Sequence, residues 1–592
     1  MSFTQSLPSS YSPDKKGATN RRFNTFDIET KGLGGSFLCA VICEGDDCET
    51  FLNSDQFCAN LLSREGIFYA HNGGKYDTTF LLKYIVSNRI DCEIKFNGSR
   101  IMSLVHKGVE IRDSFMLMPS SLEKILKSFS GKGKKNTWNT TDISKLIERC
   151  KEDCVALEEC LSRMEAKVVE YGGKSFDNCY SVAGMSFSVF SAHSNVKRLR
   201  NWDVKTDVTL RKSYFGGRVE NFILGRILNV IVYDINSMYP SCMTGMVPIG
   251  SPIRQEVVPK KLRDTDLINV SLFIKEDEYI GPIPVRDETK VIFPTGRIEG
   301  WYFWEELKTP HANGVFSDFQ IKEVWRFKED NCFGAFVSKF YNERLLAKAK
   351  GDLFIDFVCK ILLNSLYGKF ATLDFHDTFK MLSKESFDSL KKDEQDYALA
   401  HIYTVEKDGL YMITRDTELK RFFGSNVAIS SFITAKARAM LYRHMIRHKE
   451  ALVYVDTDSL HLDASKIKET VITGRELGAL KEECRGSAVY IGAKMYRIKT
   501  DRVKRSKIRC MVKGKHFGKF PLVYVFKAAN KGFRKFRFDG EENQGRMVSG
   551  KAIMKGGEWS YETIKKTANY YDFKRQFTED GGTKPLHLPE KV

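Results

Sequence analysis

The chain has 592 residues, of which 42% are hydrophobic and 28% charged, a balance typical of a folded protein of several domains. Its 93 Lys and Arg residues exceed its 75 Asp and Glu residues, and the resulting net charge of +18 favours a polyanionic partner such as nucleic acid. The sequence has no apolar run of about 18 residues and no signal-peptide-like start, which excludes a membrane-spanning or secreted protein as the default.

The cysteines and histidines give no sign of a structural metal or a disulfide framework. The 14 cysteines are scattered without a Cys-x-x-Cys pair, so we expect reduced thiols in an intracellular protein, in a compartment the sequence does not specify. His444 and His448 lie four residues apart on an expected helix, but a third ligand and the Glu of H-E-x-x-H are missing. A surface pair is therefore favoured over a zinc site.

Residues 23–179 alternate short apolar runs with helical patterns, which predicts an α/β domain after a disordered lead-in. In the expected strand FNTFDIET, Asp27 and Glu29 point to the same face and form a ready pair of metal ligands. Asp77 begins an apolar helical run in YAHNGGKYDTTFLL, and Asp153 lies on a later expected helix. Each acid taken singly is equally compatible with an ordinary surface carboxylate.

A second block, from about residue 180, carries further acids at the ends of apolar strands. Asp234 follows the buried run ILNVIVY, and Asp456 and Asp458 form the tip of the hairpin ALVYVDTDSLHL. Strand-end carboxylates brought together from distant sequence can hold two magnesium ions about 3.5–4 Å apart for in-line phosphoryl displacement. Alone, the DTDS segment is also compatible with an ordinary polar turn.

The run LFIDFVCKILLNSLYGKF predicts a helix ended by Gly368. Asp356, Lys360, Asn364 and Tyr367 recur along one face of it as a polar stripe. A Lys and an aromatic ring on one exposed helix face suit a nucleoside triphosphate, although a solvated amphipathic face would look the same.

Three stretches of the second block differ in composition from the rest. Residues 252–335 and 371–424 are rich in turn residues and mixed charge, and we interpret them as insertions. Residues 494–519 contain eleven Lys or Arg residues and a single acid, which suits binding to nucleic-acid phosphates without sequence readout.

The ordered set D-x-x-S-M-Y-P, K-x-x-x-N-S-L-Y-G and Y-V-D-T-D-S resembles motifs A, B and C of family B DNA polymerases. Tyr214-Phe-Gly-Gly-Arg218 resembles the Y-x-G-G motif, and Lys494-Met-Tyr496 resembles K-x-Y. These segments, with the long intervals between the motifs, narrow the resemblance to the protein-primed branch of tailed bacteriophages, adenoviruses and linear plasmids. The resemblance covers roughly residues 23–500.

The resemblance implies an α/β and α+β multidomain fold, with an RNase H-like exonuclease domain followed by a right-hand polymerase of palm, fingers and thumb with two insertions. The expected segments are a lead-in at 1–22, the exonuclease at 23–179, the start of the palm at 180–251, a terminal-protein-region-1-like insertion at 252–335, the fingers at 336–370, a terminal-protein-region-2-like insertion at 371–424, the remaining palm at 425–493, and the K-x-Y segment and thumb at 494–592.

For the polymerase, the resemblance implies that Asp234 and Asp458 bind the catalytic metals, with Asp456 beside them. Tyr239 would exclude a ribose 2′-hydroxyl. The implied nucleotide-binding residues are Tyr239, Lys348, Lys360, Asn364 and Tyr367, and the implied DNA-binding residues are Tyr214, Gly216, Gly217, Lys494 and Tyr496.

For the N-terminal domain, the resemblance implies a proofreading 3′–5′ exonuclease whose metal ligands are Asp27, Glu29, Asp77 and Asp153. The residues implied to hold the single-stranded 3′ end are Thr30, Asn72, Tyr76, Ser121 and Leu122. Arg149 occupies the place of the tyrosine that the family has four residues before the last acid. Arginine cannot act as a general base but can orient a phosphate, so we expect a working exonuclease with a reduced rate.

The resulting hypothesis is a DNA-directed DNA polymerase that replicates a linear viral or plasmid genome by protein-primed synthesis and proofreads it. It implies two Mg²⁺ ions per active site, with Mn²⁺ as a substitute, and as partners template and primer DNA, dNTPs and a separate terminal protein, with no membrane. Two alternatives remain: a family B polymerase that extends nucleic-acid primers, and a catalytically inert nucleic-acid-binding relative. A reverse transcriptase is disfavoured because Thr457 separates the two acids of the hairpin.

Overall fold

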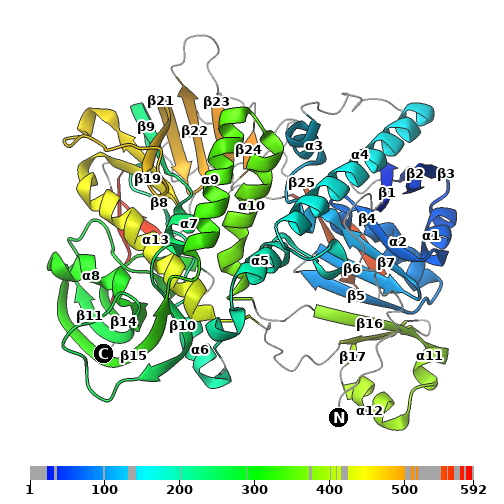
Figure 1. Cartoon of the computed structure of the whole chain (residues 1–592), viewed down its shortest axis with the longest axis horizontal. Helices are drawn as coiled ribbons and strands as arrows, with labels where there is room; N and C mark the ends of the chain where they lie inside the picture. Colours follow the sequence, from blue (N-terminus) through cyan, green and yellow to red (C-terminus); the bar gives the residue numbers. More distant parts are fainter. Residues whose placement is uncertain are drawn as a thin grey trace.

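The computed structural model arranges the chain in two lobes, with the N-terminal strands and helices in one and most of the second block in the other (Figure 1). It describes the following residues: 23–31, 36–97, 100–130, 142–201, 203–287, 290–372, 377–400, 402–407, 410–414, 424–500, 508–512, 515–517, 548–555, 558–565, 574–578 and 582–589. The expected lead-in at 1–22 and much of the basic stretch after residue 500 lie outside them.

A mixed sheet, here called the N-terminal sheet, forms the first lobe. The β-branched and aromatic residues of its strands pack on both faces against helices. Its N-terminal strands are β1 (Asn24–Thr30), β2 (Phe37–Glu44), β3 (Asp47–Phe51), β4 (Gly66–Ala70), β5 (Cys92–Asn97), β6 (Arg100–His106) and β7 (Val109–Asp113). The helices are α1 (Ser54–Ser63), α2 (Thr78–Ser87), α3 (Leu122–Ser130) and α4 (Ile143–Glu170).

Strands from the expected second insertion extend this N-terminal sheet. Strand β16 (Asp377–Ser383) pairs antiparallel with β5, and β18 (Leu410–Thr414) and β17 (Ile402–Lys407) follow it, giving the order β17-β18-β16-β5-β6-β7-β4-β1-β2-β3. Asp91 anchors the junction, because its carboxylate accepts hydrogen bonds from the backbone N–H of Ser383 at 2.6 Å and from the Ser386 hydroxyl. Helices α11 (Lys384–Asp388) and α12 (Lys392–Ala400) lie beside these strands, below the blue sheet in Figure 1.

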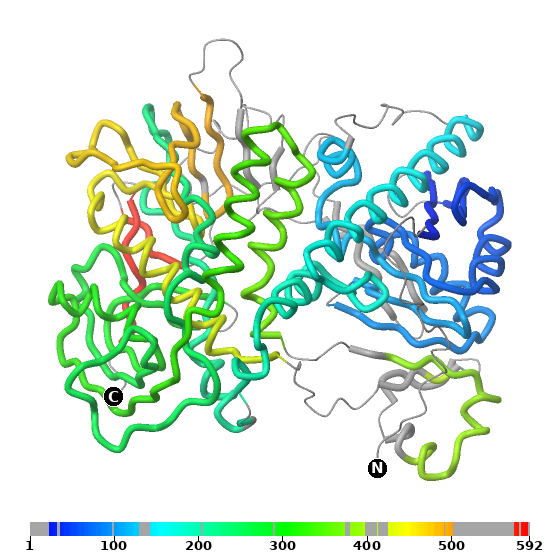
Figure 2. The backbone as a smooth tube through the Cα atoms, viewed as in Figure 1, coloured from blue at the N-terminus to red at the C-terminus, as the bar shows by residue number. Residues whose placement is uncertain are grey.

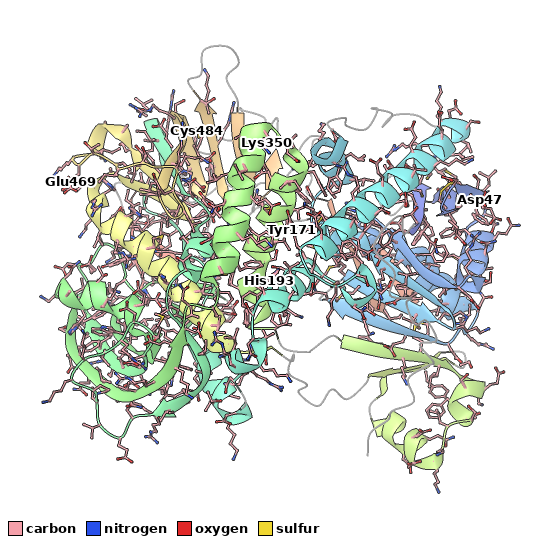
Figure 3. The ribbon with its side chains drawn as sticks, in the orientation of Figure 1. Asp47, Tyr171, His193, Lys350, Glu469 and Cys484 are labelled. Carbon is pink, nitrogen blue, oxygen red and sulfur yellow. A yellow bond between two sulfur atoms is a disulfide. The ribbon has the colours of Figure 1, made fainter. Side chains whose placement is uncertain are left out.

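Helices α5 (Val182–His193), α9 (Gly334–Lys350) and α10 (Leu353–Lys369) occupy the junction between the lobes (Figure 2). Tyr171, labelled in Figure 3, caps α4 and donates a hydrogen bond from its hydroxyl to Glu343 on α9. The Phe129 ring of α3 contacts Phe354 of α10, with centroids 4.5 Å apart. The first lobe is therefore packed directly against α9 and α10.

The second lobe is built on the sheet β24-β23-β22-β21-β9-β20-β19-β8, here called the central sheet. Helix α13 (Val427–Arg447) is buried along most of its length in this lobe, where it packs against α7 (Met238–Met243) and α8 (Trp304–Ala312). The strands are β8 (Val219–Asn221), β9 (Gly225–Ile235), β19 (Leu452–Asp456), β20 (Ser459–Asp463), β21 (Leu480–Gly492), β22 (Met495–Thr500), β23 (Ile508–Val512) and β24 (Lys515–Phe517).

The expected first insertion forms a separate antiparallel sheet, β10-β15-β11-β14, to which β29 from the end of the chain adds in parallel. Its strands are β10 (Val247–Arg254), β11 (Leu267–Ile274), β14 (Thr295–Phe303), β15 (Phe316–Asp330) and β29 (His587–Leu588). The flanking helices are α6 (Val204–Lys212), α7 (Met238–Met243) and α8 (Trp304–Ala312).

Short hairpins complete the described fold: β12 (Val285–Asp287) with β13 (Lys290–Ile292), β25 (Val548–Lys555) with β26 (Glu558–Lys565), and β27 (Arg575–Phe577) with β28 (Thr583–Pro585). Among the helices that the structure describes, none is both long and apolar enough to cross a lipid bilayer.

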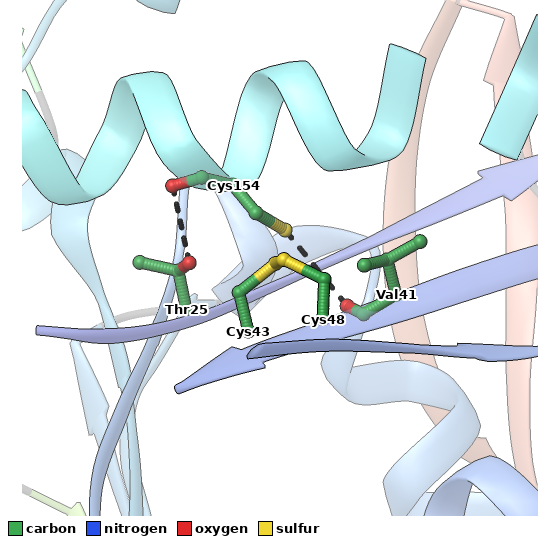
Figure 4. The surroundings of a disulfide bond; sticks show 5 residues. All are labelled: Thr25, Val41, Cys43, Cys48 and Cys154. Carbon is green, nitrogen blue, oxygen red and sulfur yellow. Dashed lines mark hydrogen bonds between the residues drawn. A yellow bond between two sulfur atoms is a disulfide. The ribbon is translucent and has the colours of Figure 1, made fainter. Parts of the chain in front are cut away.

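The expectation that all cysteines are reduced is wrong for one pair. Cys43 and Cys48 are opposite each other in the register of the β2–β3 hairpin, and they form a disulfide (Figure 4). The other cysteines of the described residues carry no disulfide, and most are buried. Sequence spacing did not reveal the pair because a hairpin register, and not a Cys-x-x-Cys motif, brings the two sulfur atoms together.

Candidate active site

Asp234 and Asp458 lie side by side at one end of the central sheet. Asp234 is near the end of β9, where it lies opposite Ser459 of β20 in the antiparallel register. The backbone N–H of Ile235 donates a 2.8 Å hydrogen bond to the carbonyl of Asp458, so the hairpin tip is tied to the end of β9. The predicted juxtaposition of motif A and motif C acids is therefore a direct result of strand pairing.

Burial and neighbouring negative charge disfavour the ionisation of both carboxyl groups. Burial, followed by the charge of Asp458, raises the pKa of Asp234 to about 7. Burial also raises the pKa of Asp458. Partly buried carboxylates that repel each other are stabilised by a shared positive charge, so this pair of oxygen donors fits divalent cations such as Mg²⁺.

Asp456, the other acid of the hairpin, is engaged by the K-x-Y lysine. Lys494 Nζ lies 2.6 and 2.8 Å from the two carboxylate oxygens of Asp456, and the Tyr454 hydroxyl donates to the same group at 3.1 Å. The Lys494 backbone N–H donates to the Tyr454 oxygen at 3.0 Å. The structure thus joins motif C to the K-x-Y segment through one ion pair.

Tyr496 of the same motif lies in an aromatic cluster behind that ion pair. Its ring centroid is 5.3 Å from that of Tyr454, 5.1 Å from that of His461 and 5.5 Å from that of Tyr490. This packing fixes the start of β22, and with it the position from which Lys494 reaches Asp456.

Tyr239 and Tyr367 face each other across the site. Their rings stack with centroids 4.5 Å apart and planes at 18°, which joins α7 to α10. Gly217 lies against motif A and motif C. A Cβ added to it would come 3.1 Å from the Tyr239 hydroxyl of motif A and 2.9 Å from Thr457 Cγ2 of motif C. The second glycine of the Y-x-G-G segment is therefore required by close packing, whereas the first, Gly216, has open space around it.

Buried arginines hold the Y-x-G-G segment in place. Arg438 of α13 donates to the carbonyls of Phe215 and Gly216 at 2.7 and 3.1 Å, while its guanidinium pairs with the buried Glu306. The Arg218 carbonyl accepts a 2.7 Å hydrogen bond from Thr457 at the hairpin tip. Tyr214, half-buried, precedes this segment. Sequence reasoning missed Arg438, because nothing near it in the chain indicates this contact.

The polar stripe predicted on α10 is only partly exposed. Lys360 and Asn364 are exposed, and Tyr367 is half-buried against Tyr239. Asp356, in contrast, pairs with Arg344 of α9 at 2.7 Å, and Arg344 also donates to the Ser237 hydroxyl at 3.0 Å.

The helix α10 continues one residue past Gly368, to Lys369, because Phe370 rather than the glycine caps it. Lys348 lies on α9, one helical turn from Arg344. Burial and the charge of Arg344 lower the pKa of Lys348, so the two cations form one positive surface on α9. Arg344 is a further candidate that the sequence analysis did not single out.

A second set of carboxylates lies in the N-terminal lobe. Asp27 and Glu29 of β1 have carboxylate oxygens within 4.8 Å of each other and of the Cys150 sulfur of α4. Asp77, at the N-terminus of α2, has its pKa raised to about 7 by burial, with smaller contributions from Asp113 and Glu29. Asp153 is buried one turn beyond Arg149 on α4.

The same carboxylates converge on one buried thiol. The pKa of Cys154 is raised first by burial and then by Asp27, with Asp153 and Asp77 contributing further. This electrostatic overlap shows that the predicted acids from three distant segments surround one region. As carboxylate oxygen donors gathered in one partly buried region, they fit a divalent metal.

The expected 3′-end contacts lie around this second set. Asn72 adopts a left-handed backbone conformation, φ 66°. Its N–H donates to Asp113 at 2.9 Å, and its side-chain oxygen accepts from Arg100 at 2.8 Å. Arg100 also pairs with Asp113. Asp113 and Arg100 were not singled out from the sequence, because only the strand pairing brings them beside Asn72.

The remaining expected contacts are distributed over three elements. Thr30 ends β1, Tyr76 caps the short 3₁₀ turn before Asp77, and Leu122 begins α3 after the exposed Ser121. Leu122 itself is buried, so its side chain supports α3 instead of lying open to solvent.

Comparison with known families identifies the family to which the chain with these two carboxylate sets belongs. The family model "DNA polymerase type B, organellar and viral" matches residues 57–146 and 132–451, which together make up more than half of the chain. The chain belongs to this family. It is a DNA-directed DNA polymerase of the type B group found in phages and plasmids.

Individual relatives agree with the family assignment. The DNA-directed DNA polymerase of Enterobacteria phage PRD1 is 29% identical to this polymerase over 470 residues, which is 76% of each chain. A probable DNA polymerase of Ascobolus immersus is 24% identical over 83% of this chain but only 47% of its own length. The polymerase thus spans about half the length of that fungal relative.

A solved structure shares the fold. Phi29 DNA polymerase in complex with primer-template DNA and incoming nucleotides matches this polymerase with a TM-score of 0.68 and 18% identity, over 93% of this chain and 100% of that one. At this identity the likeness establishes the mixed α/β multidomain fold and leaves residue roles to the geometry described above.

Proposed function

We propose that this polymerase synthesises DNA at the central sheet by two-metal nucleotidyl transfer, proofreads it in the N-terminal lobe, and starts from a protein primer. The observation that carries the proposal is the adjacency of Asp234 and Asp458, with Lys360 of α10 acting on Asp234 electrostatically. In this assignment the central sheet is the palm, α9 and α10 are the fingers, and the N-terminal lobe is an RNase H-like exonuclease.

In the synthetic reaction each group of the chain has a defined task. Asp234 and Asp458 would hold Mg²⁺, which supplies charge stabilisation to the attacking 3′-oxygen and the leaving pyrophosphate. Lys348 and Lys360 neutralise the triphosphate, and Arg344 joins them on the same helix pair. Tyr239, stacked on Tyr367, forms the wall against which the sugar of the incoming nucleotide packs.

In proofreading, Asp27, Glu29, Asp77 and Asp153 would hold the metal ions that activate water. Asn72, positioned by Arg100 and Asp113, lies where it can bind the single-stranded 3′ end. Thr30, Tyr76 and Ser121 would contribute further contacts to that strand. The arrangement supports a hydrolytic site separate from the synthetic one.

Protein priming is proposed for the sheet formed by the first insertion. Ile253, Val257 and Val258 are exposed there, with exposed fractions of 65%, 79% and 45%. An apolar patch of this kind at the end of β10, interspersed with charge, suits a protein partner better than DNA. Extension of nucleic-acid primers alone remains the second candidate function.

One gel assay tests the first two activities. On a labelled primed template with Mg²⁺, the primer should lengthen with dNTPs and shorten without them. Asp458→Ala should abolish lengthening and keep shortening, whereas Asp27→Ala should do the reverse. A chain that neither lengthens nor shortens the primer would support an inert DNA-binding relative instead.

A second assay tests priming. The terminal protein from the same genetic element should become labelled by a dNTP in the presence of this polymerase, and Val257→Asp should reduce that labelling without affecting extension of a DNA primer. Equal labelling by the variant would assign the patch no role in priming.

A further inference from the structure

Arg149 contacts a member of the N-terminal carboxylate set. Its Nε lies 3.1 Å from Glu29 Oε1, and both side chains are only 16% exposed. Arg149 is four residues before Asp153 on α4, so the two side chains share one helix face. The residue that departs from the family pattern is therefore an ion-pair partner of an expected metal ligand.

The helix α4 holds Arg149 there through fixed contacts. The Thr25 hydroxyl donates to the carbonyl of Cys154 at 3.1 Å, and the Cys154 thiol donates to the carbonyl of Val41 at 3.8 Å (Figure 4). One turn earlier, the Cys150 thiol donates to the carbonyl of Asp27 at 3.9 Å. Because β1 and β2 both fix α4, the backbone of Arg149 has a defined position from which its guanidinium reaches Glu29.

A guanidinium and a divalent cation compete for the same carboxylate. In a partly buried site the attraction between charges is screened less than at the surface, so a fixed cation at Glu29 weakens the binding of a second one. Metal binding that uses Glu29 must displace Arg149 or share the carboxylate with it. At the synthetic site, the cations that act on the carboxylates are lysines: Lys481 and Lys360 for Asp234, and Lys494 for Asp458.

We propose that Arg149 is a positioning residue that competes with the divalent metal for Glu29, so that the exonuclease site fills only at a higher free metal concentration than an otherwise identical site. The inference rests on the proposed exonuclease. It makes the balance between shortening and lengthening of a primer depend on free metal, with low metal favouring synthesis.

Metal binding is measured directly on the full chain carrying Asp234→Asn and Asp458→Asn, which removes the ligands of the synthetic site. Titration with Mn²⁺, followed by the electron paramagnetic resonance signal of the free ion, gives the dissociation constant. Arg149→Gln should lower this constant at least ten-fold, and Arg149→Lys should leave it within about three-fold. Equal constants for Arg149→Gln and the unchanged residue would overturn the inference.

Arg64→Gln is the matched control. Arg64 also pairs with two glutamates of the same lobe, Glu44 and Glu49, each at 2.5 Å, but away from the metal ligands. The Arg64→Gln variant loses the same charge as Arg149→Gln and should leave the dissociation constant for Mn²⁺ unchanged. If Arg64→Gln lowered the dissociation constant for Mn²⁺ as much as Arg149→Gln, the change would be explained by net charge alone, and the proposed role of Arg149 would be overturned.

The activity arm uses the chain with an intact synthetic site. Primer shortening without dNTPs should reach half of its maximal rate at a lower Mn²⁺ concentration in Arg149→Gln. Loss of shortening with an unchanged Mn²⁺ constant would instead assign Arg149 to the substrate phosphate. If Asp27→Asn fails to change Mn²⁺ binding and no variant shortens DNA, the exonuclease proposal itself fails, which is distinct from failure of the Arg149 inference alone.

Discussion

Lys494 forms an ion pair with both carboxylate oxygens of Asp456, and the hydroxyl of Tyr454, two residues earlier on the same strand, donates to that carboxylate as well. The ion pair links two motifs that are separated by the whole of β20 and β21. It means that Lys494, which the family resemblance implies to bind DNA, is positioned by an acid of the synthetic site.

We expect Lys494→Ala and Asp456→Asn to be coupled. Each should lower kcat/KM for primer extension, and the double variant should lose less than the sum of the two, with a coupling energy of about 1 kcal/mol because the lysine is partly exposed. Steady-state extension kinetics of the four proteins measure it. Additive losses would show that the two side chains act independently.

Gly217→Ala should disrupt synthesis selectively. The added methyl group would lie 2.9 Å from Thr457 Cγ2, so the turn that carries Asp458 must move. A shift of this kind in a metal ligand lowers the extension rate on the order of 100-fold. Gly216→Ala, at a position with nothing within 4 Å, adds the same methyl group without displacing this turn, and its loss of extension should be far smaller than that of Gly217→Ala. Shortening of the primer should be unaffected in both.

The raised pKa of Asp234 predicts a pH-dependent effect of metal. Its folded pKa of about 7 is above the value of about 3.9 for an unfolded chain, so its contribution to the stability of the metal-free protein is present below pH 4 and is lost as pH rises through 7. A divalent cation binds the ionised form, so Mg²⁺ should raise the thermal midpoint more at pH 8 than at pH 6.

Asp234→Asn is the control for that measurement. The variant cannot ionise at this position and should show a smaller metal-induced shift, with less dependence on pH. A metal-induced shift that is the same at pH 6 and pH 8 in the unchanged protein would contradict the prediction.

The lowered pKa of His444 predicts that the folded protein loses stability in acid. Burial, followed by the charges of Arg447, His448 and Arg443, lowers its pKa to about 4. Because the folded pKa is below the unfolded value of about 6.5, the stabilisation is complete above pH 6.5 and is lost as pH falls toward 4. His444→Gln should remove about 1–2 kcal/mol of the stability difference between pH 7.5 and 5, as measured by urea unfolding. An unchanged difference would exclude this histidine as its source.

Sequence patterns predicted the elements whose chemistry is local. The strand before Asp234, the hairpin at Asp456 and Asp458 and the helix with Lys360 are all present as expected, and the polymerase family is confirmed. Strand periodicity and the order of the motifs carry that information within short segments.

Long-range contacts could not be predicted in this way. Arg344, Arg438 and Arg100 each act through a partner on another element, and no local pattern distinguishes them from surface arginines. The Cys43–Cys48 pair depended on a hairpin register in the same way. Arg149 was noticed as a departure from the family, but its partner, Glu29, became evident only when α4 was packed on β1.

The pairing of β16 with β5 has a consequence for dissecting the protein. A fragment that begins after the N-terminal lobe would leave β16 with a row of unpaired backbone groups, the kind of exposed edge that recruits strands from other molecules. Conversely, the isolated N-terminal lobe would expose β5. The two halves of the chain are thus poor candidates for separate expression, and single substitutions are the appropriate means of separating their activities.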